Sequence, residues 1–157
     1  DLTAAIEARP TPERYLLRGR IDEAAGDLDA AARGYREGLD HLGGAVVLEL
    51  ALIRVERERG HLALAIARID ALIRRAPVAA DLRLERAAIL AAAGDREGAE
   101  AELGRALQEI DGVLERRPSA LHALTRARIL AALGRRAEAR TIAAAIEREH
   151  PAAGRRP

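Results

Sequence analysis

The sequence predicts an all-α protein built from stacked helical hairpins, and three observations carry this prediction. Glycines that suit turns recur at Gly26, Gly60, Gly94 and Gly134, with two equal intervals followed by a longer one. An alanine follows each of them at the fifth position. Leu, Ile, Val and Ala supply nearly all of the 49% hydrophobic content, because Tyr15 and Tyr35 are the only aromatic residues. A fixed period with a turn residue and a small residue in phase is typical of helix–turn–helix repeats.

A short helix is expected at the start of the sequence, before the first complete hairpin. Residues 1–8 have the composition of the last two helical turns, and Pro10 ends them because proline cannot continue a helix. We interpret residues 1–10 as the remnant helix of a preceding repeat.

Four complete repeats follow in the prediction, each with two helices, and no Gly- or Ser-rich linker separates them. Thr11 and Ser119 are expected to be N-caps, and residues 152–157 are expected to be a tail. Residues 1–151 are predicted to form a single array with repeats over 11–44, 45–77, 78–118 and 119–151. The expected helices lie near 12–25, 28–41, 45–59, 62–75, 79–93, 96–117, 119–133 and 136–149.

The helix near 96–117 is predicted to be longer than its counterparts. Pro118 is the nineteenth position after Ala99, whereas Pro77 is the twelfth position after Ala65. The excess of seven is close to two helical turns, so the extension keeps the same face inward. Glycine is unfavourable inside a helix, so a kink or break is expected at Gly112.

The phased residues resemble the tetratricopeptide repeat. This resemblance rests on small residues in the first helix, an alanine early in the second helix and a closing proline. These residues are Gly19, Ala87 and Ala127; Ala31, Ala65, Ala99 and Ala139; and Pro77, Pro118 and Pro151. It implies a right-handed α-solenoid that binds proteins. Arg18, Arg86 and Arg126 depart from the pattern, since they stand where the family has a large apolar residue; their aliphatic stems are expected to pack while the guanidinium groups reach water.

In the family that the sequence resembles, the first helices line a concave groove that holds a peptide or helix of a partner. Arg20, Arg54 and Arg128 each follow a leucine by four residues and so share its helix face. Such a surface suits an acidic, partly apolar segment, although these arginines are equally well explained as solvated side chains. The candidate groove residues are Glu13, Leu16, Arg20, Leu50, Arg54, Leu84, Ala88, Leu124 and Arg128.

The sequence offers no recognisable catalytic, cofactor or metal site. It lacks cysteine, and its only serine, Ser119, is expected to cap a helix. The histidines lie in separate hairpins without the close spacing of metal ligands, and they are expected at the surface. The prediction is therefore a non-enzyme with no cofactor and no metal. The histidines are His41, His61, His122 and His150.

The charge is unevenly distributed along the chain. Net charge is +1, but residues 1–115 carry −6 (16 Arg, 22 acids) and residues 116–157 carry +7 (10 Arg, 3 acids). We interpret the basic part as a solvated terminal hairpin and tail. Nucleic acid is not an expected partner, because aromatic stacking platforms are missing. No apolar run is long enough to span a bilayer.

The sequence therefore predicts a non-catalytic scaffold or adaptor that binds a protein or peptide. The alternative is an accessory or regulatory domain cut from a larger protein, such as an enzyme or transcription regulator. Self-association through the N-terminal end is also expected, because the remnant helix lacks its hairpin mate.

Overall fold

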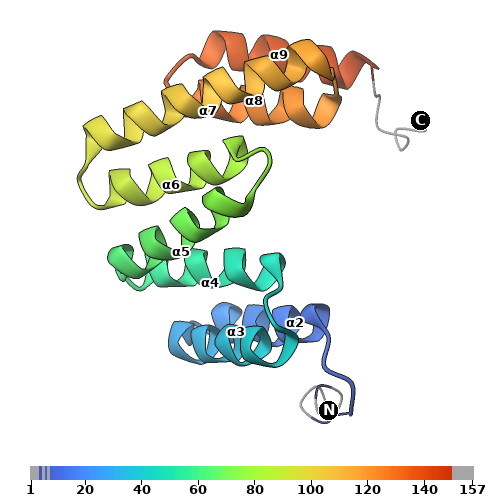
Figure 1. The fold of residues 1–157 in the computed structure, drawn as a ribbon, viewed down its shortest axis with the longest axis vertical. Coiled ribbons are helices and arrows are strands. Elements are labelled where there is room, and N and C mark those ends of the chain that lie inside the picture. Colours follow the sequence, from blue (N-terminus) through green and yellow to red (C-terminus); the bar gives the residue numbers. More distant parts are fainter. Residues whose placement is uncertain (1–3, 5, 7, 150–157) are drawn as a thin grey trace. The chain divides into compact units, whose positions relative to one another are not determined.

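The computed structural model describes residues 4, 6 and 8–149, and every regular element among them is a helix (Figure 1). The observed bounds lie within one residue of the predicted ones, so the all-α prediction is confirmed. The helices are α2 (Pro12–Ala24), α3 (Leu28–Leu42), α4 (Val46–Glu58), α5 (Leu62–Arg75), α6 (Ala80–Ala92), α7 (Arg96–Arg116), α8 (Ala120–Ala132) and α9 (Arg136–Glu149).

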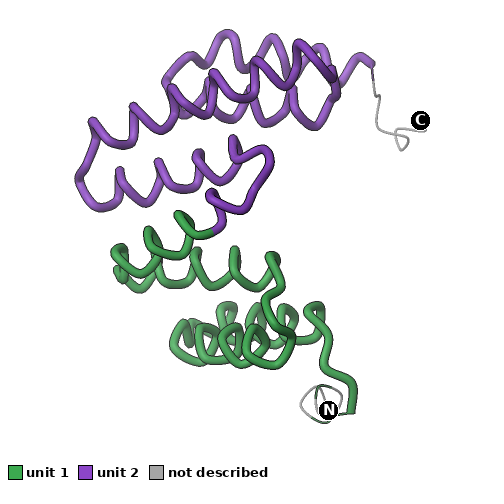
Figure 2. Tube along the Cα trace, viewed as in Figure 1, with its two compact units in different colours: residues 1–71 green, residues 72–157 purple. Residues whose placement is uncertain are grey.

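The chain divides into two compact units, Asp1–Ala71 and Leu72–Pro157, with the boundary inside α5 (Figure 2). Unit 1 contains α2, α3, α4 and the first part of α5. Unit 2 contains the rest of α5 and α6 to α9. The boundary does not coincide with a predicted repeat boundary, and the single array over residues 1–151 stays a prediction.

Each hairpin turn uses a glycine in the left-handed region. The φ angles are 80° at Gly26, 78° at Gly60, 84° at Gly94 and 77° at Gly134. In the first turn, Gly26 N–H donates to the carbonyl of Glu23 and Asp27 N–H donates to the carbonyl of Asp22. This bond pattern closes a helix at a residue with positive φ, which glycine adopts without a steric penalty. The four predicted turns are therefore confirmed.

Side chains cap several helices at their N-termini. The carboxylate of Asp27 accepts from Ala30 N–H, and that of Asp95 accepts from Gly98 N–H, both at 2.8 Å. Ser119 accepts from His122 N–H at 3.1 Å, as predicted. Thr11 occupies the N-cap position of α2, but its side chain makes no capping bond. The Thr11 prediction is thus correct in position only.

The core of unit 1 forms where α2 packs against α3 and α3 packs against α4. Tyr15 and Tyr35 are 1% and 0% exposed, so both aromatic side chains belong to this core. A Cβ atom on Gly19 would lie 2.2 Å from Cε1 of Tyr35. Gly19 is therefore required by the tyrosine that packs on it. Tyr15 also exchanges a hydrogen bond of 2.5 Å with His41 Nδ1.

In unit 2, α7 packs against both α6 and α8, and α8 packs against α9. α7 runs unbroken through Gly112, so the break expected there is absent. Its buried apolar residues are spaced by four, three, four and three positions, which keeps one face inward along the whole helix. They are Ala99, Leu103, Ala106, Ile110 and Val113.

The segment before α2 is described at only some positions. Ala4, Ile6 and Ala8 are helical, and Ile6 is buried in the core of unit 1. Both facts agree with a helix at the predicted remnant. The remaining residues of 1–7 and the predicted tail over 152–157 lie outside the described residues.

Candidate protein-binding surface

The predicted groove residues of unit 1 lie on α2 and α4, the first helices of two successive hairpins, which contact each other. Glu13 and Arg20 are exposed, and Leu50 is 37% exposed. Leu16 is partly buried because it packs against the core. α4 adds two exposed residues that the sequence prediction missed, Val46 and Val47, at 58% and 43%.

Arg54 of this groove is held by a carboxylate of its own unit. Both of its terminal nitrogens donate to Glu23, whose Oε1 also accepts from the Tyr35 hydroxyl at 2.5 Å. Burial opposes ionisation of Glu23, but the bonds from Arg54 and Tyr35 outweigh it and lower its pKa. Burial and the Glu23 bond raise the pKa of Tyr35 well above its ordinary range. Arg54 therefore fastens α4 to α2 and is not available as a bidentate clamp.

Arg20 differs from Arg54 in being accessible. It lies one turn before Glu23 on α2, is exposed, and forms no ion pair among the residues that the structure describes. In the predicted groove of unit 1, the exposed Arg20 and the exposed apolar side chains of α4 are therefore accessible to a partner.

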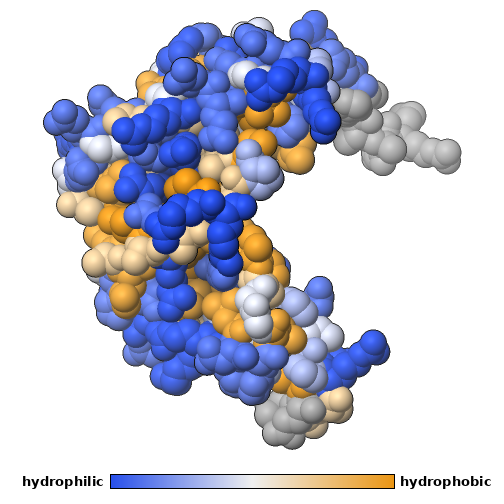
Figure 3. Space-filling model, in the orientation of Figure 1, coloured by the Kyte–Doolittle hydropathy of each residue, from blue (hydrophilic) through white to orange (hydrophobic). Residues whose placement is uncertain are grey.

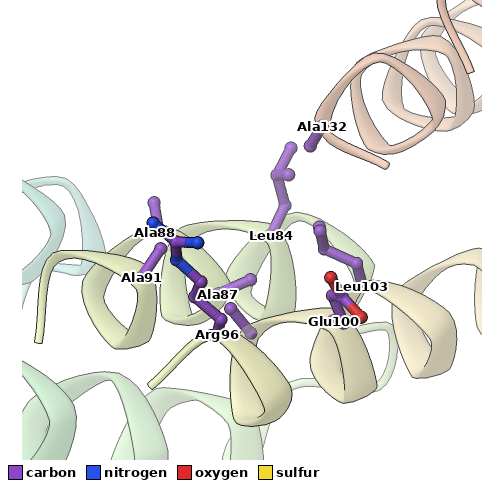
Figure 4. A pocket seen from close by; sticks show the side chains of 9 residues that line it. Leu84, Ala87, Ala88, Ala91, Arg96, Glu100, Leu103 and Ala132 are labelled. Carbon is purple, nitrogen blue, oxygen red and sulfur yellow. The ribbon is translucent and has the colours of Figure 1, made fainter. Parts of the chain in front are cut away.

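In unit 2, the predicted Leu84 and Ala88 line an open cavity of about 270 Å³. Figure 4 shows its lining residues on three helices: Leu84 and alanines of α6, Arg96 and Glu100 of α7, and Ala132 of α8. The lining is mostly apolar, with one cation and one carboxylate. The complete set is Leu84, Ala87, Ala88, Ala91, Arg96, Ala99, Glu100, Leu103 and Ala132.

Arg128 of unit 2 is also paired. It contacts Asp81 at 3.1 Å and Glu85 at 3.6 Å, and Thr125 donates to the Asp81 carboxylate at 3.0 Å. These contacts join α8 to α6. Leu124, the other predicted residue on α8, is 47% exposed, and Leu121 on the same helix is 70% exposed. Figure 3 shows that hydrophobic surface lies between hydrophilic areas on the face in view.

Two buried carboxylates escaped the sequence analysis. Glu56 of α4 is 1% exposed and accepts from Arg36, Arg59 and His61. Burial would raise its pKa, but the bonds from Arg36 and His61 outweigh burial, so the pKa of Glu56 is lowered. Glu102 of α7 is equally buried, with 2% of its surface exposed, and it meets three cations of unit 2. They are Arg83, Arg86 and Arg105.

The three arginines that depart from the repeat pattern are explained by ion pairs. Arg18 pairs with Glu37 at 2.7 Å, and its guanidinium lies 5.2 Å from the Tyr15 ring centre. Arg86 pairs with Glu102, and Arg126 pairs with Asp111. Each guanidinium group thus binds a carboxylate on the second helix of a hairpin, α3 or α7. The expectation that these groups only reach water is incomplete.

Over the described residues, no group of three or more His, Asp or Glu side chains is arranged to hold a metal ion. His41 and His61 are exposed, as predicted, whereas His122 is partly buried and His150 lies outside the described residues. None of the helices described combines the length and apolarity needed to cross a membrane.

Comparison with known proteins places the fold. No family model matches the sequence, and the search of curated proteins found no relative. Among solved structures, the chain is similar to a thermophilic TPR protein of Thermus thermophilus. The two share 22% identity and a TM-score of 0.62, over 97% of this chain and 81% of the other. Together with the phased hairpins, this similarity shows that the chain has the tetratricopeptide-repeat fold, an all-α solenoid of helical hairpins.

Proposed function

We propose that the protein is a non-catalytic interaction scaffold that binds a partly apolar peptide or helix through its first helices. The observation that carries the proposal is the exposure of large apolar side chains there. Val47 and Leu50 of α4 and Leu121 and Leu124 of α8 are between 37% and 70% exposed. In either unit, exposed apolar side chains of this kind on a first helix are what a bound segment would bury.

The proposed partner carries an acidic residue opposite Arg20. Of the three predicted groove arginines, Arg54 and Arg128 already pair with carboxylates of their own units. Arg20 has no such pair among the described residues. Of the three arginines, it is therefore the one that supports a preference for acidic partners. An ion pair formed by an exposed arginine contributes about 0.2–1 kcal/mol, which is up to about a five-fold change in Kd.

The proposal is tested by selecting binders from a random peptide library displayed on phage and measuring their affinity by calorimetry. We expect enrichment of apolar peptides with an acidic residue, and weaker binding to L50E and L124E. R20E should lose affinity for the acidic peptides while keeping its helicity. L64E is the matched control, because Leu64 is 53% exposed on α5, a second helix. Failure to enrich any peptide, or equal binding by all variants, would reject the proposed function.

A further inference from the structure

The cavity between α6 and α7 lies within unit 2 and includes two residues of the predicted groove, Leu84 and Ala88. Its volume is about 270 Å³, whereas a cavity of about 150 Å³ is large enough to bind benzene. On α8, which contacts α6, Leu124 stands at the repeat position of Leu84 and is 47% exposed. The cavity therefore has room for an aromatic ring beside exposed apolar side chains of the same unit.

The same place in the α2–α3 hairpin is occupied by large side chains of unit 1. Residues are compared here by their distance from the turn glycine of their hairpin. Three cavity positions carry larger residues in unit 1 than in unit 2. The larger residues are Arg20, Glu23 and Tyr35, and their equivalents in unit 2 are Ala88, Ala91 and Leu103. The cavity exists because unit 2 has small residues where unit 1 has an aromatic ring and two charged side chains.

The Tyr35 side chain shows which chemical group these positions hold in unit 1. Tyr35 is 0% exposed, and its hydroxyl donates to Oε1 of Glu23, which also accepts from Arg54. The site thus combines an apolar surface for the ring, a carboxylate for the hydroxyl and an arginine beside that carboxylate. A phenol is the side-chain group that uses the apolar surface and the carboxylate together.

The α6–α7 cavity has the same kinds of group at its edge. Glu100 and Arg96 of α7 line it, are exposed and form no ion pair among the described residues. Figure 4 shows the Glu100 side chain beside that of Leu103. It also shows Arg96 extending toward Ala88 and Ala91 of α6. Unit 2 therefore presents an apolar space, a carboxylate and an arginine, without an aromatic ring among them.

We propose that the α6–α7 cavity receives a tyrosine side chain of the segment that the scaffold binds. The ring packs against Ala91 and Leu103, and the hydroxyl donates to the Glu100 carboxylate. This inference rests on the proposed function, since the tyrosine belongs to the bound segment. It adds a specificity that exposed leucines do not supply, because an apolar side chain without a hydroxyl leaves Glu100 without that bond.

The site is tested first with p-cresol, which carries the phenol of tyrosine, and with toluene, which lacks the hydroxyl. NMR titration of the backbone amides should show p-cresol bound beside α6 and α7, about two- to ten-fold more tightly than toluene. E100A should remove this preference. A91L should fill the cavity and bind neither probe. A101L is the matched control and should bind both unchanged, because Ala101 is exposed on α7 and does not line the cavity.

Refilling the cavity with the residues of unit 1 gives a second disruption, should A91L unfold. The variant A87G/A91E/L103Y installs the glycine, carboxylate and tyrosine of the α2–α3 hairpin, and it should exclude both probes. Circular dichroism and thermal melts establish that each variant is folded. The proposal is overturned if p-cresol does not bind, if toluene binds equally well, or if a folded variant with a filled cavity binds p-cresol unchanged.

Peptides from the phage library separate this inference from the proposed function. Peptides that bind the unchanged protein should carry a tyrosine, and its replacement by phenylalanine should weaken binding about two- to ten-fold. Peptides that L124E weakens, but that respond neither to this replacement nor to A91L, overturn the inference and leave the scaffold function standing. A library that yields no peptide rejects the scaffold function, and p-cresol binding alone then decides whether the cavity is a phenol site.

Discussion

The α2–α3 hairpin of unit 1 and the α6–α7 hairpin of unit 2 use different pairs of residues at the same two positions of the repeat. At the ninth position after the turn glycine stands Tyr35 in the first and Leu103 in the second. At the seventh position before it stands Gly19 or Ala87. All four residues are buried. Each hairpin therefore pairs a small residue of its first helix with a large residue of its second helix. The first hairpin combines the smallest residue with the larger side chain, Gly19 with Tyr35, whereas the other combines Ala87 with Leu103.

The largest difference between the hairpins should appear when the second-helix side chain is truncated. Y35A should lower the free energy of unfolding by about 3–5 kcal/mol, because it removes a buried aromatic ring. L103A should cost about 2–3 kcal/mol, since less volume is lost. Urea unfolding followed by circular dichroism measures both values. Equal losses of stability for Y35A and L103A would contradict the proposed difference between the two hairpins.

The steric limit at Gly19 gives a sharper test of the same exchange. G19A places a Cβ atom 2.2 Å from Tyr35, so it should cost about 1–3 kcal/mol through overpacking. The double variant G19A/Y35L recreates the Ala–Leu pair of unit 2 and should be more stable than the sum of its single variants predicts. Additive effects in this double-mutant cycle would show that the two sites are independent.

The buried carboxylates differ between the units in their helix, with Glu56 on a first helix and Glu102 on a second helix. E56Q should cost about 1–3 kcal/mol at neutral pH, because Arg36, Arg59 and His61 lose their shared partner. E102Q provides the matched measurement in unit 2. A stable E56Q protein would indicate that the three cations are satisfied by water instead.

The lowered pKa of Glu56 also gives its contribution a pH dependence. In the unfolded chain the carboxyl titrates near its ordinary value of 4.5, and in the folded chain it titrates lower. The unfolded state then binds the proton first, so this stability is present above pH 4.5 and is lost as pH falls through the folded pKa. Urea unfolding at several pH values should show that E56Q is less sensitive to acid than the unchanged protein over this window.

The smallest expected effect concerns the helix starts. S119A should cost about 1 kcal/mol, because the hydroxyl caps α8. T11A should change stability by only a few tenths of a kcal/mol, since the Thr11 side chain makes no capping bond. Thermal unfolding of the two variants under identical conditions compares them directly. Similar losses would show that Thr11 caps α2 in solution.

The helices and turns were predictable because the signals are local. A glycine with positive φ, a proline after a helix and an alanine in phase each act within a few residues, and they placed the bounds of α2 to α9 within one residue. Gly112 was the exception: two buried neighbours, Ile110 and Val113, keep that stretch of α7 helical despite the unfavourable residue.

The candidate surface was less predictable, since it depends on which long side chains meet. Arg20 and Arg54 occupy the same position of their repeats, yet only Arg54 reaches a carboxylate, that of Glu23 on another helix. Glu56 and Glu102 look like solvated charges in the sequence, and only the three-dimensional arrangement places arginines from other helices around them. Pairings across helices carry no short-range sequence signal.

The two extra turns of α7 show how such a protein changes length. Seven residues restore almost the same rotational phase, so Ile110 and Val113 continue the buried face begun by Leu103 and Ala106. The added length also carries Asp111, which pairs with Arg126 of the next helix. An insertion of one or two residues would instead turn this face toward water. Insertions and deletions in these helices should therefore be tolerated in multiples of seven residues. The lengths of equivalent helices in related sequences should differ in the same steps.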